Sequence, residues 1–328
     1  MKKVVRKSLR LVFPIALGSF ILYWVYRDFD FSQVRETLLH GTRWGWMLFS
    51  LLFGVLAQAF RGWRWRQMLE PLGAYPKRSN CVNAIFVSYA ASLVIPRIGE
   101  VSRCGILSKY DKVSFAQSLG TVVTERLVDM LTILLVTVVT VLLQFPLFAT
   151  FLHQTGTKIP SLLHLFSSVW FYMALCCFIG ILLLLYFLRK TFSFYEKVKG
   201  FAISLREGIL SLRGVQGLPL FLFYTLAIWA CYFLHFYFTF YCFGFTSGLG
   251  LMAALVMFVG GTFAVIVPTP NGAGPWHVAI ITMMMLYGIN VEEAGIFALI
   301  VHGVQTFLVV LLGVYGLAAL PLANRTRQ

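Results

Sequence analysis

Long runs of apolar residues, separated by short polar segments, dominate the chain. A membrane-spanning helix needs on the order of 20 predominantly apolar residues, and aromatic flanks such as Trp44 and Trp63 extend the shorter runs toward the membrane interface. The pattern predicts an all-α, polytopic membrane protein with about six spanning helices. The predicted spans are residues 11–26, 44–60, 127–145, 168–188, 217–243 and 295–320.

Two further apolar regions are interrupted by proline and glycine. Residues 81–96 form a short apolar run that ends in a charged turn, and residues 251–288 are broken near their middle. Proline lacks a backbone N–H and glycine adopts turn geometries readily. We therefore predict two re-entrant helical hairpins, the first returning through residues 114–125; two kinked full spans are the alternative. The predicted hairpin tips contain Pro96, Gly99, Pro268, Pro270, Gly272 and Gly274.

The composition supports a membrane protein and argues against a nucleic-acid-binding one. The chain is 59% hydrophobic and only 12% charged, whereas soluble domains are about 25% charged. The net charge of +15 comes from lysines and arginines at the ends of apolar runs, as in cytoplasmic membrane anchors. The histidines show no metal-ligand spacing and the cysteines form no CxxC pair. We expect no catalytic residue, cofactor or metal site, and no nucleic-acid partner.

The distribution of basic residues predicts the orientation. With the N-terminus inside and both hairpins re-entrant, 23 of the 27 lysines and arginines fall on the cytoplasmic side, as the positive-inside rule requires. A full span at residues 81–96 would instead place the basic loop that follows it outside. We therefore predict a multi-pass protein of the bacterial cytoplasmic (inner) membrane, with both termini in the cytoplasm.

The predicted elements occur in the same order twice within one integral membrane domain, residues 1–328. Each half, residues 1–150 and 151–328, reads as a span, an amphipathic linker, a span, a broken hairpin and a span, and the second half starts from the opposite side. Inverted halves with broken helices are typical of transporters that have a binding site at the membrane midplane. We expect an inverted-repeat arrangement of this kind.

Charged residues follow the first hairpin directly. Arg97, Glu100 and Arg103 are three residues apart, so a helix would carry them on one face. Charge at membrane depth is costly and indicates a functional site, and guanidinium groups suit phosphate oxygens. A salt-bridge cluster at the cytoplasmic surface is the alternative interpretation.

A second charged group, Glu125, Arg126 and Asp129, opens the next long apolar run. Glu125 and Asp129 share a helix face, and Arg126 lies three residues from Asp129. These residues either complete a buried charge network with the preceding arginines or form ion pairs at a helix end.

Two polar residues accompany the second break. Asn271 could contact a polar ligand, or could belong to a tight packing turn. His277 follows the turn, where it could bind substrate or couple transport to protons, or could be a satisfied interfacial histidine.

Three blocks resemble the transmembrane domain of lysylphosphatidylglycerol synthases and the wider flippase-like family of membrane proteins. They are Pro96–Arg103, Glu125–Asp129 and Pro268–Gly274. The resemblance implies an integral membrane domain associated with lipid translocation, in a standalone form without the soluble aminoacyl-transfer domain. The third block departs from the usual Pro-Gly-Gly-x-Gly and later glutamate, because Asn271 replaces the first glycine and His277 stands near the position of the acid.

The sequence therefore favours a flippase-like lipid transporter over an enzyme. It would bind or move an anionic phospholipid or lipid-linked headgroup between the two hairpins. One alternative is a membrane enzyme that uses Glu100, Glu125 and Asp129 as catalytic acids or metal ligands. Another is a non-catalytic envelope scaffold. A homo-oligomer and an envelope-enzyme partner both stay open.

Overall fold

The computed structural model describes residues 2–27, 29–96, 98–145 and 217–325, and its regular structure over these residues is entirely helical. The α-helices are α1 (Lys2–Tyr26), α2 (Phe31–Glu36), α3 (Trp44–Leu69), α4 (Arg78–Val94), α5 (Ile98–Asp111), α6 (Phe115–Leu143), α11 (Leu218–Tyr237), α12 (Leu251–Ala264), α13 (Pro275–Leu286) and α14 (Val291–Ala323).

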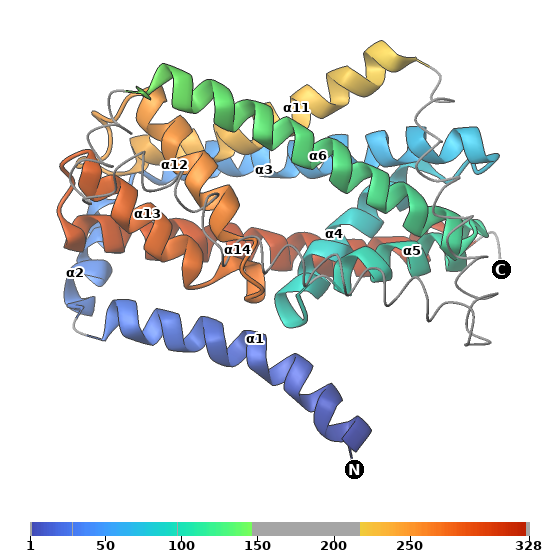
Figure 1. Ribbon diagram of the computed structural model, residues 1–328, viewed down its shortest axis with the longest axis horizontal. Coiled ribbons are helices and arrows are strands. Elements are labelled where there is room, and N and C mark those ends of the chain that lie inside the picture. The colour runs from blue at the N-terminus through green and yellow to red at the C-terminus, as the bar shows by residue number, and fades with distance from the viewer. Residues whose placement is uncertain (1, 28, 97, 146–216, 326–328) are drawn as a thin grey trace, which may run out of the picture.

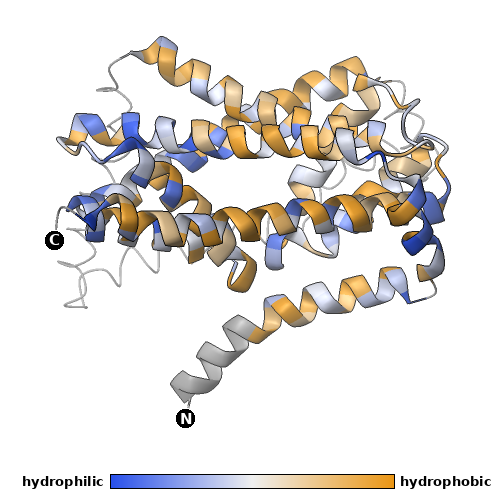
Figure 2. Cartoon of the chain, turned by 180° about the vertical axis from the view of Figure 1, so that it is seen from behind, coloured by the Kyte–Doolittle hydropathy of each residue, from blue (hydrophilic) through white to orange (hydrophobic). Residues whose placement is uncertain are grey.

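Four helices, α3, α6, α11 and α14, are long and apolar enough to cross a membrane. They coincide with four of the six predicted spans, although α6 ends at Leu143 and α11 at Tyr237, before the predicted ends at residues 145 and 243. Figure 2 shows hydrophobic residues along the length of these helices and hydrophilic residues gathered near the two ends of the bundle. The predicted span 11–26 lies in α1, whose apolar part, Val12–Tyr26, is shorter, and span 168–188 lies outside the described residues. The chain is thus a multi-pass membrane protein.

Four shorter helices pair into two helical hairpins. Helix α4 packs against α5, and α12 packs against α13. The longest of them, α4, has 17 residues, so it extends about 26 Å and falls short of the roughly 30 Å hydrocarbon core. Both proline-glycine breaks predicted from the sequence lie at the turns of these hairpins.

The return arm of the first hairpin differs from the prediction. It is α5, Ile98–Asp111, whereas residues 114–125 belong to α6, which continues without a break to Leu143. Lys112 ends α5 by adopting a left-handed conformation with φ of 59°. The charged side chains of α5 can lie within the helical bundle because they pair with residues of α6. The sequence of α5 alone does not reveal this pairing.

The two hairpins lie toward opposite ends of the bundle, and their turns approach each other near its middle (Figure 1). Helix α4 packs along α14, and α3 packs along α11. The order of long helix, hairpin and long helix occurs twice, in α3–α6 and in α11–α14. This order agrees with the predicted layout, and the inverted-repeat relation itself stays a prediction.

Each hairpin has its own hydrophobic core. The core around the first hairpin joins α3, α4, α5 and α6 and contains the buried residues Trp65, Leu69, Cys81, Ala84, Ile85, Cys104, Leu107, Val113 and Val122. The core around the second hairpin is larger and joins α12, α13 and the start of α14 to the end of α1. The polar residues between the turns therefore lie between two apolar clusters.

The first hairpin closes tightly because α5 begins with a glycine against α4. The Gly99 N–H donates to the Ser92 hydroxyl at 3.3 Å, and a methyl group at Gly99 would collide with the backbone oxygen of Ser88. Gly105 on the same helix has no atom within contact range of such a methyl group.

We predict that Gly99→Ala destabilises the protein, whereas Gly105→Ala does not. Overpacking at the hairpin should lower the free energy of unfolding by about 1–3 kcal/mol, while alanine at an open helical position is neutral or stabilising by up to about 1 kcal/mol. Thermal unfolding of both purified variants measures the difference. Equal melting temperatures would contradict the close packing of α5 on α4.

Candidate functional site

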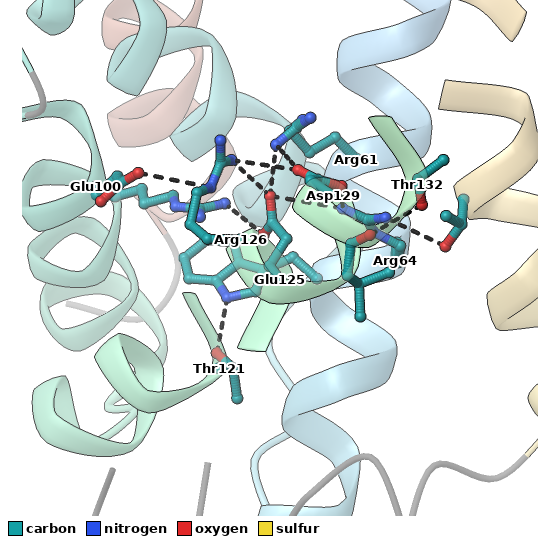
Figure 3. Close-up of polar contacts among 12 residues, drawn as sticks. Arg61, Arg64, Glu100, Thr121, Glu125, Arg126, Asp129 and Thr132 are labelled. Atoms are coloured by element: carbon teal, nitrogen blue, oxygen red, sulfur yellow. Dashed lines mark hydrogen bonds and ion pairs between the residues drawn. The ribbon is translucent and has the colours of Figure 1, made fainter. Parts of the chain in front are cut away.

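A cluster of charged side chains lies between the long helices and the first hairpin (Figure 3). Three helices contribute to this central ion cluster, and four of its seven members are arginines. Its residues are Arg61 and Arg64 from α3, Glu100 and Arg103 from α5, and Glu125, Arg126 and Asp129 from α6.

Glu125 is the centre of this cluster, and its side chain is fully buried. Arg61 Nη1 donates to Oε1 of Glu125 at 2.6 Å, and Arg103 Nη1 donates to Oε2 at 2.8 Å. Arg126 Nη2 also donates to Oε1, at 2.9 Å. One carboxylate therefore fastens α3 and α5 to α6.

Asp129, one helical turn further along α6, holds the second arginine of α3. Arg64 Nη2 donates to Oδ1 of Asp129 at 2.7 Å, and Arg61 Nη1 donates to Oδ2 at 3.0 Å. Arg64 Nη1 also donates to the Thr225 hydroxyl of α11 at 3.1 Å. The cluster thus reaches a fourth helix.

The positive charge in the buried part of the cluster is not fully neutralised by the described residues. The three buried arginines, Arg61, Arg64 and Arg103, face two buried carboxylates. The remaining pair, Arg126 and Glu100, is partly exposed, with 3.5 Å between Nε and Oε1. Among the described residues, Nη2 of Arg103 and Nε of both Arg61 and Arg64 are buried without a hydrogen-bond partner.

Aromatic rings lie close to all three buried guanidinium groups, including that of Arg64, which is 5.9 Å from the centre of the Phe221 ring. Arg103 lies 4.7 Å from the centre of the Trp65 ring, and Arg61 lies 5.9 and 5.7 Å from the rings of Tyr89 and Tyr232. The two tyrosine hydroxyls are 2.8 Å apart. Such cation–π contacts stabilise a guanidinium group without adding a negative charge.

A cavity of about 230 Å³ separates the central ion cluster from the second hairpin turn. The two hairpin turns and the exposed edge of the cluster form its walls. It is lined from one side by Arg61, Ser88, Tyr89, Ser92, Pro96, Glu100, Arg103 and Arg126, and from the other by Val265, Ile266, Val267, Pro268, Thr269, Asn271 and Gly272.

The structure brings half of the predicted site residues to the lining of this cavity. Glu100, Arg103, Arg126 and Asn271 line it, together with the tip residues Pro96, Pro268 and Gly272. Arg97 lies outside the described residues. The predicted residues that do not line the cavity are Glu125, Asp129, His277, Gly99, Pro270 and Gly274.

Those six residues have other positions around the cavity. Glu125 and Asp129 lie behind the arginines and hold them. The Nδ1 atom of His277 accepts from the backbone N–H of Gly274 at 3.3 Å. Gly99 closes the first hairpin, and Pro270 begins a short 3₁₀ turn at the second.

Sequence reasoning missed Arg61 and Arg64, because the predicted span ends at residue 60 and leaves both arginines outside it. Helix α3 instead continues to Leu69, and both arginines are buried in it. A signal was available in the helical spacing, since Gly54, Ala57 and Gln58 are buried on the same face. Small and polar residues at that spacing indicate a buried helix face that continues through the arginines.

The cluster has the chemistry of an anion site. Its wall facing the cavity carries three guanidinium groups and one carboxylate, Glu100, which already pairs with Arg126. Within the described part of the chain, no group of three or more histidine, cysteine, aspartate or glutamate residues is arranged to hold a metal ion.

Comparison with protein-family models gives one match, which covers residues 11–313. The matching model is the lysylphosphatidylglycerol synthase TM region. No curated protein and no solved structure matches the chain.

We predict that Glu125→Gln strongly destabilises the protein, because it leaves Arg61 and Arg103 buried without their main counter-charge. Breaking a buried ion pair from one side costs about 3–5 kcal/mol. Glu70→Gln is the matched control, since Glu70 forms a partly exposed pair with Arg66 at 3.3 Å and such pairs contribute about 0–1 kcal/mol. Thermal unfolding in the same detergent compares them; similar losses would contradict a central role for Glu125.

Proposed function

The chain belongs to the lysylphosphatidylglycerol synthase TM region family, and from this membership we propose that it is a flippase-like lipid transporter. Its substrate is an anionic phospholipid or a lipid-linked anionic headgroup. The headgroup binds in the cavity between the two hairpin turns, against Arg103 and Arg126.

One observation carries this proposal: the buried positive charge beside the cavity exceeds the buried negative charge. An unpaired charge in a low-dielectric interior is unfavourable, so an incoming anion would relieve it. Arg103 lines the cavity, and its Nη2 atom has no hydrogen-bond partner among the described residues. A phosphate oxygen is a suitable acceptor for that N–H group.

The buried carboxylates give this site its rigidity. Glu125 and Asp129 bind terminal Nη atoms of Arg61, Arg64 and Arg103, which fixes these side chains before any ligand arrives. A preorganised site avoids the entropy loss of ordering long side chains on binding. The two acids therefore position the arginines, and the arginines make the contacts with the headgroup.

The hairpins supply a route for alternating access. Both are re-entrant in this proposal, and they reach the cavity from opposite membrane surfaces, with the chain termini on the cytoplasmic side of the inner membrane. Movement of one turn away from the other would open the cavity to one side only, as in transporters built from inverted repeats. The apolar residues Val265, Ile266 and Val267 lie where the second turn closes the cavity.

We predict that Arg126→Gln weakens anionic-lipid binding by about tenfold or more, since a hydrogen bond to a charged group contributes about 1.5–3 kcal/mol. Its side chain is 44% exposed, so its removal should leave the fold intact. Lys109→Gln is the control, because it removes one positive charge from the exposed end of α5. Native mass spectrometry with phosphatidylglycerol measures binding, and proteoliposomes with a headgroup-labelled lipid measure translocation.

Equal lipid binding and equal translocation by Arg126→Gln and Lys109→Gln would overturn the site assignment. A chemically altered lipid among the recovered products would instead favour an enzyme that acts on a lipid-linked substrate.

A further inference from the structure

Two histidines contact each other beside the second hairpin turn, with their rings tilted by 57°. His277 of α13 and His302 of α14 have ring centres 4.6 Å apart. His277 is only 2% exposed. Neither residue lines the cavity, but both hold the turn that does.

His302 takes part in a closed ring of hydrogen bonds with the turn. The Asn271 side-chain amide donates to the Thr306 hydroxyl at 2.8 Å, and that hydroxyl contacts His302 Nδ1 at 3.5 Å. His302 Nε2 lies 3.1 Å from the backbone oxygen of Asn271. Asn271 also lines the cavity, so this ring joins the histidine pair directly to the cavity wall.

The partners determine which nitrogen atoms carry hydrogen. A carbonyl oxygen only accepts, so His302 Nε2 must be the donor to Asn271. His302 Nδ1 can then be unprotonated, accepting from Thr306, or protonated, donating to it, because a hydroxyl serves in both roles. His302 therefore keeps its contacts in either protonation state.

His277, in contrast, can keep its hydrogen bond in only one protonation state. Its Nδ1 accepts from the Gly274 N–H, so it must be unprotonated, and the neutral ring carries its hydrogen on Nε2. A proton added at Nδ1 would face the Gly274 N–H donor to donor. Gly274 has φ of 92°, a conformation that non-glycine residues rarely adopt, and losing its only side-chain acceptor would release the turn.

The surroundings of the pair offer little compensation for a positive charge. From α1, the Tyr26 ring lies edge-on to His277 at 5.8 Å, and its hydroxyl already donates to Gly295. Helix α12 contains no ionisable residue. The acids of α14, Glu292 and Glu293, precede His302 by about 15 Å along the helix axis. Beyond Asn271, the charged groups that line the opposite side of the cavity are Arg61, Glu100, Arg103 and Arg126.

We propose that Nδ1 of His277, beside the ring of His302, is a proton-binding site whose occupancy opens the second hairpin turn. The two rings together accept only one additional proton, because two like charges with ring centres 4.6 Å apart repel. A proton on Nδ1 of His277 breaks the hydrogen bond from the Gly274 N–H. The step is a reversible protonation, with no other reactant and no other product. Its role in transport rests on the proposed function, and the proton site itself does not.

The test is hydrogen–deuterium exchange of the full chain in nanodiscs of zwitterionic phosphatidylcholine, between about pH 5 and pH 8, corrected for intrinsic exchange rates. Opening of residues 265–278 should increase on acidification by up to about tenfold per pH unit, the limit for one coupled proton. His277→Gln keeps an acceptor for Gly274 but cannot be protonated, so its exchange should lose this pH dependence.

The matched control is His235→Gln, which alters another buried histidine, held by the Ser50 backbone oxygen at 2.7 Å. It should retain the response of the unmodified protein. A flat profile in the unmodified protein, or an unchanged response in His277→Gln, would overturn the proton site. A response that His277→Gln abolishes supports it even if Arg126→Gln leaves lipid binding unchanged, a result that would count against the lipid site alone.

Discussion

The pairing of buried arginines with Glu125 and Asp129 is the interaction on which the rest of the structure depends. Arg61, Arg64 and Arg103 come from two helices, and one short stretch of α6 holds them all. Without these carboxylates, mutual repulsion and desolvation would exclude the arginines from the bundle. The first hairpin could then not lie against α3 and α6, and the cavity would lose one wall.

The hairpin turns depend on a different physical factor, which is backbone conformation. Asn271, Gly272 and Gly274 all have positive φ in the second turn, so the chain reverses within a few residues. The freed backbone groups are satisfied locally, by His277 and His302. Irregular backbone inside a membrane protein is tolerated when such partners are present or when it lines a cavity, and both conditions hold here.

Local sequence patterns predicted the features that depend on local physics. Apolar run length marked α3, α6, α11 and α14, and proline with glycine marked both hairpin breaks. The same patterns failed where distant residues decide the outcome. The predicted span in α3 ends at residue 60 because Arg61 and Arg64 are charged. The carboxylates that pair with these arginines lie more than 60 positions later, in α6. The position of the return arm depends on a distant contact as well, because the buried charge of Arg103 in α5 is paired by Glu125 of α6.

Asn271 anchors the second hairpin turn through its side chain as well as through its backbone. Among non-glycine residues, asparagine is one of those that best tolerate the left-handed conformation, here with φ of 52° and ψ of 24°. Glycine, which occupies this position in the sequence pattern that the third block resembles, would allow the same fold of the chain. A glycine at this position would lack the side-chain amide that donates a hydrogen bond to Thr306. Exchange between these two residues during evolution would therefore add or remove one anchor of the turn without changing its backbone path. If the turn opens as proposed, related chains would differ in the rate of opening while keeping the same architecture.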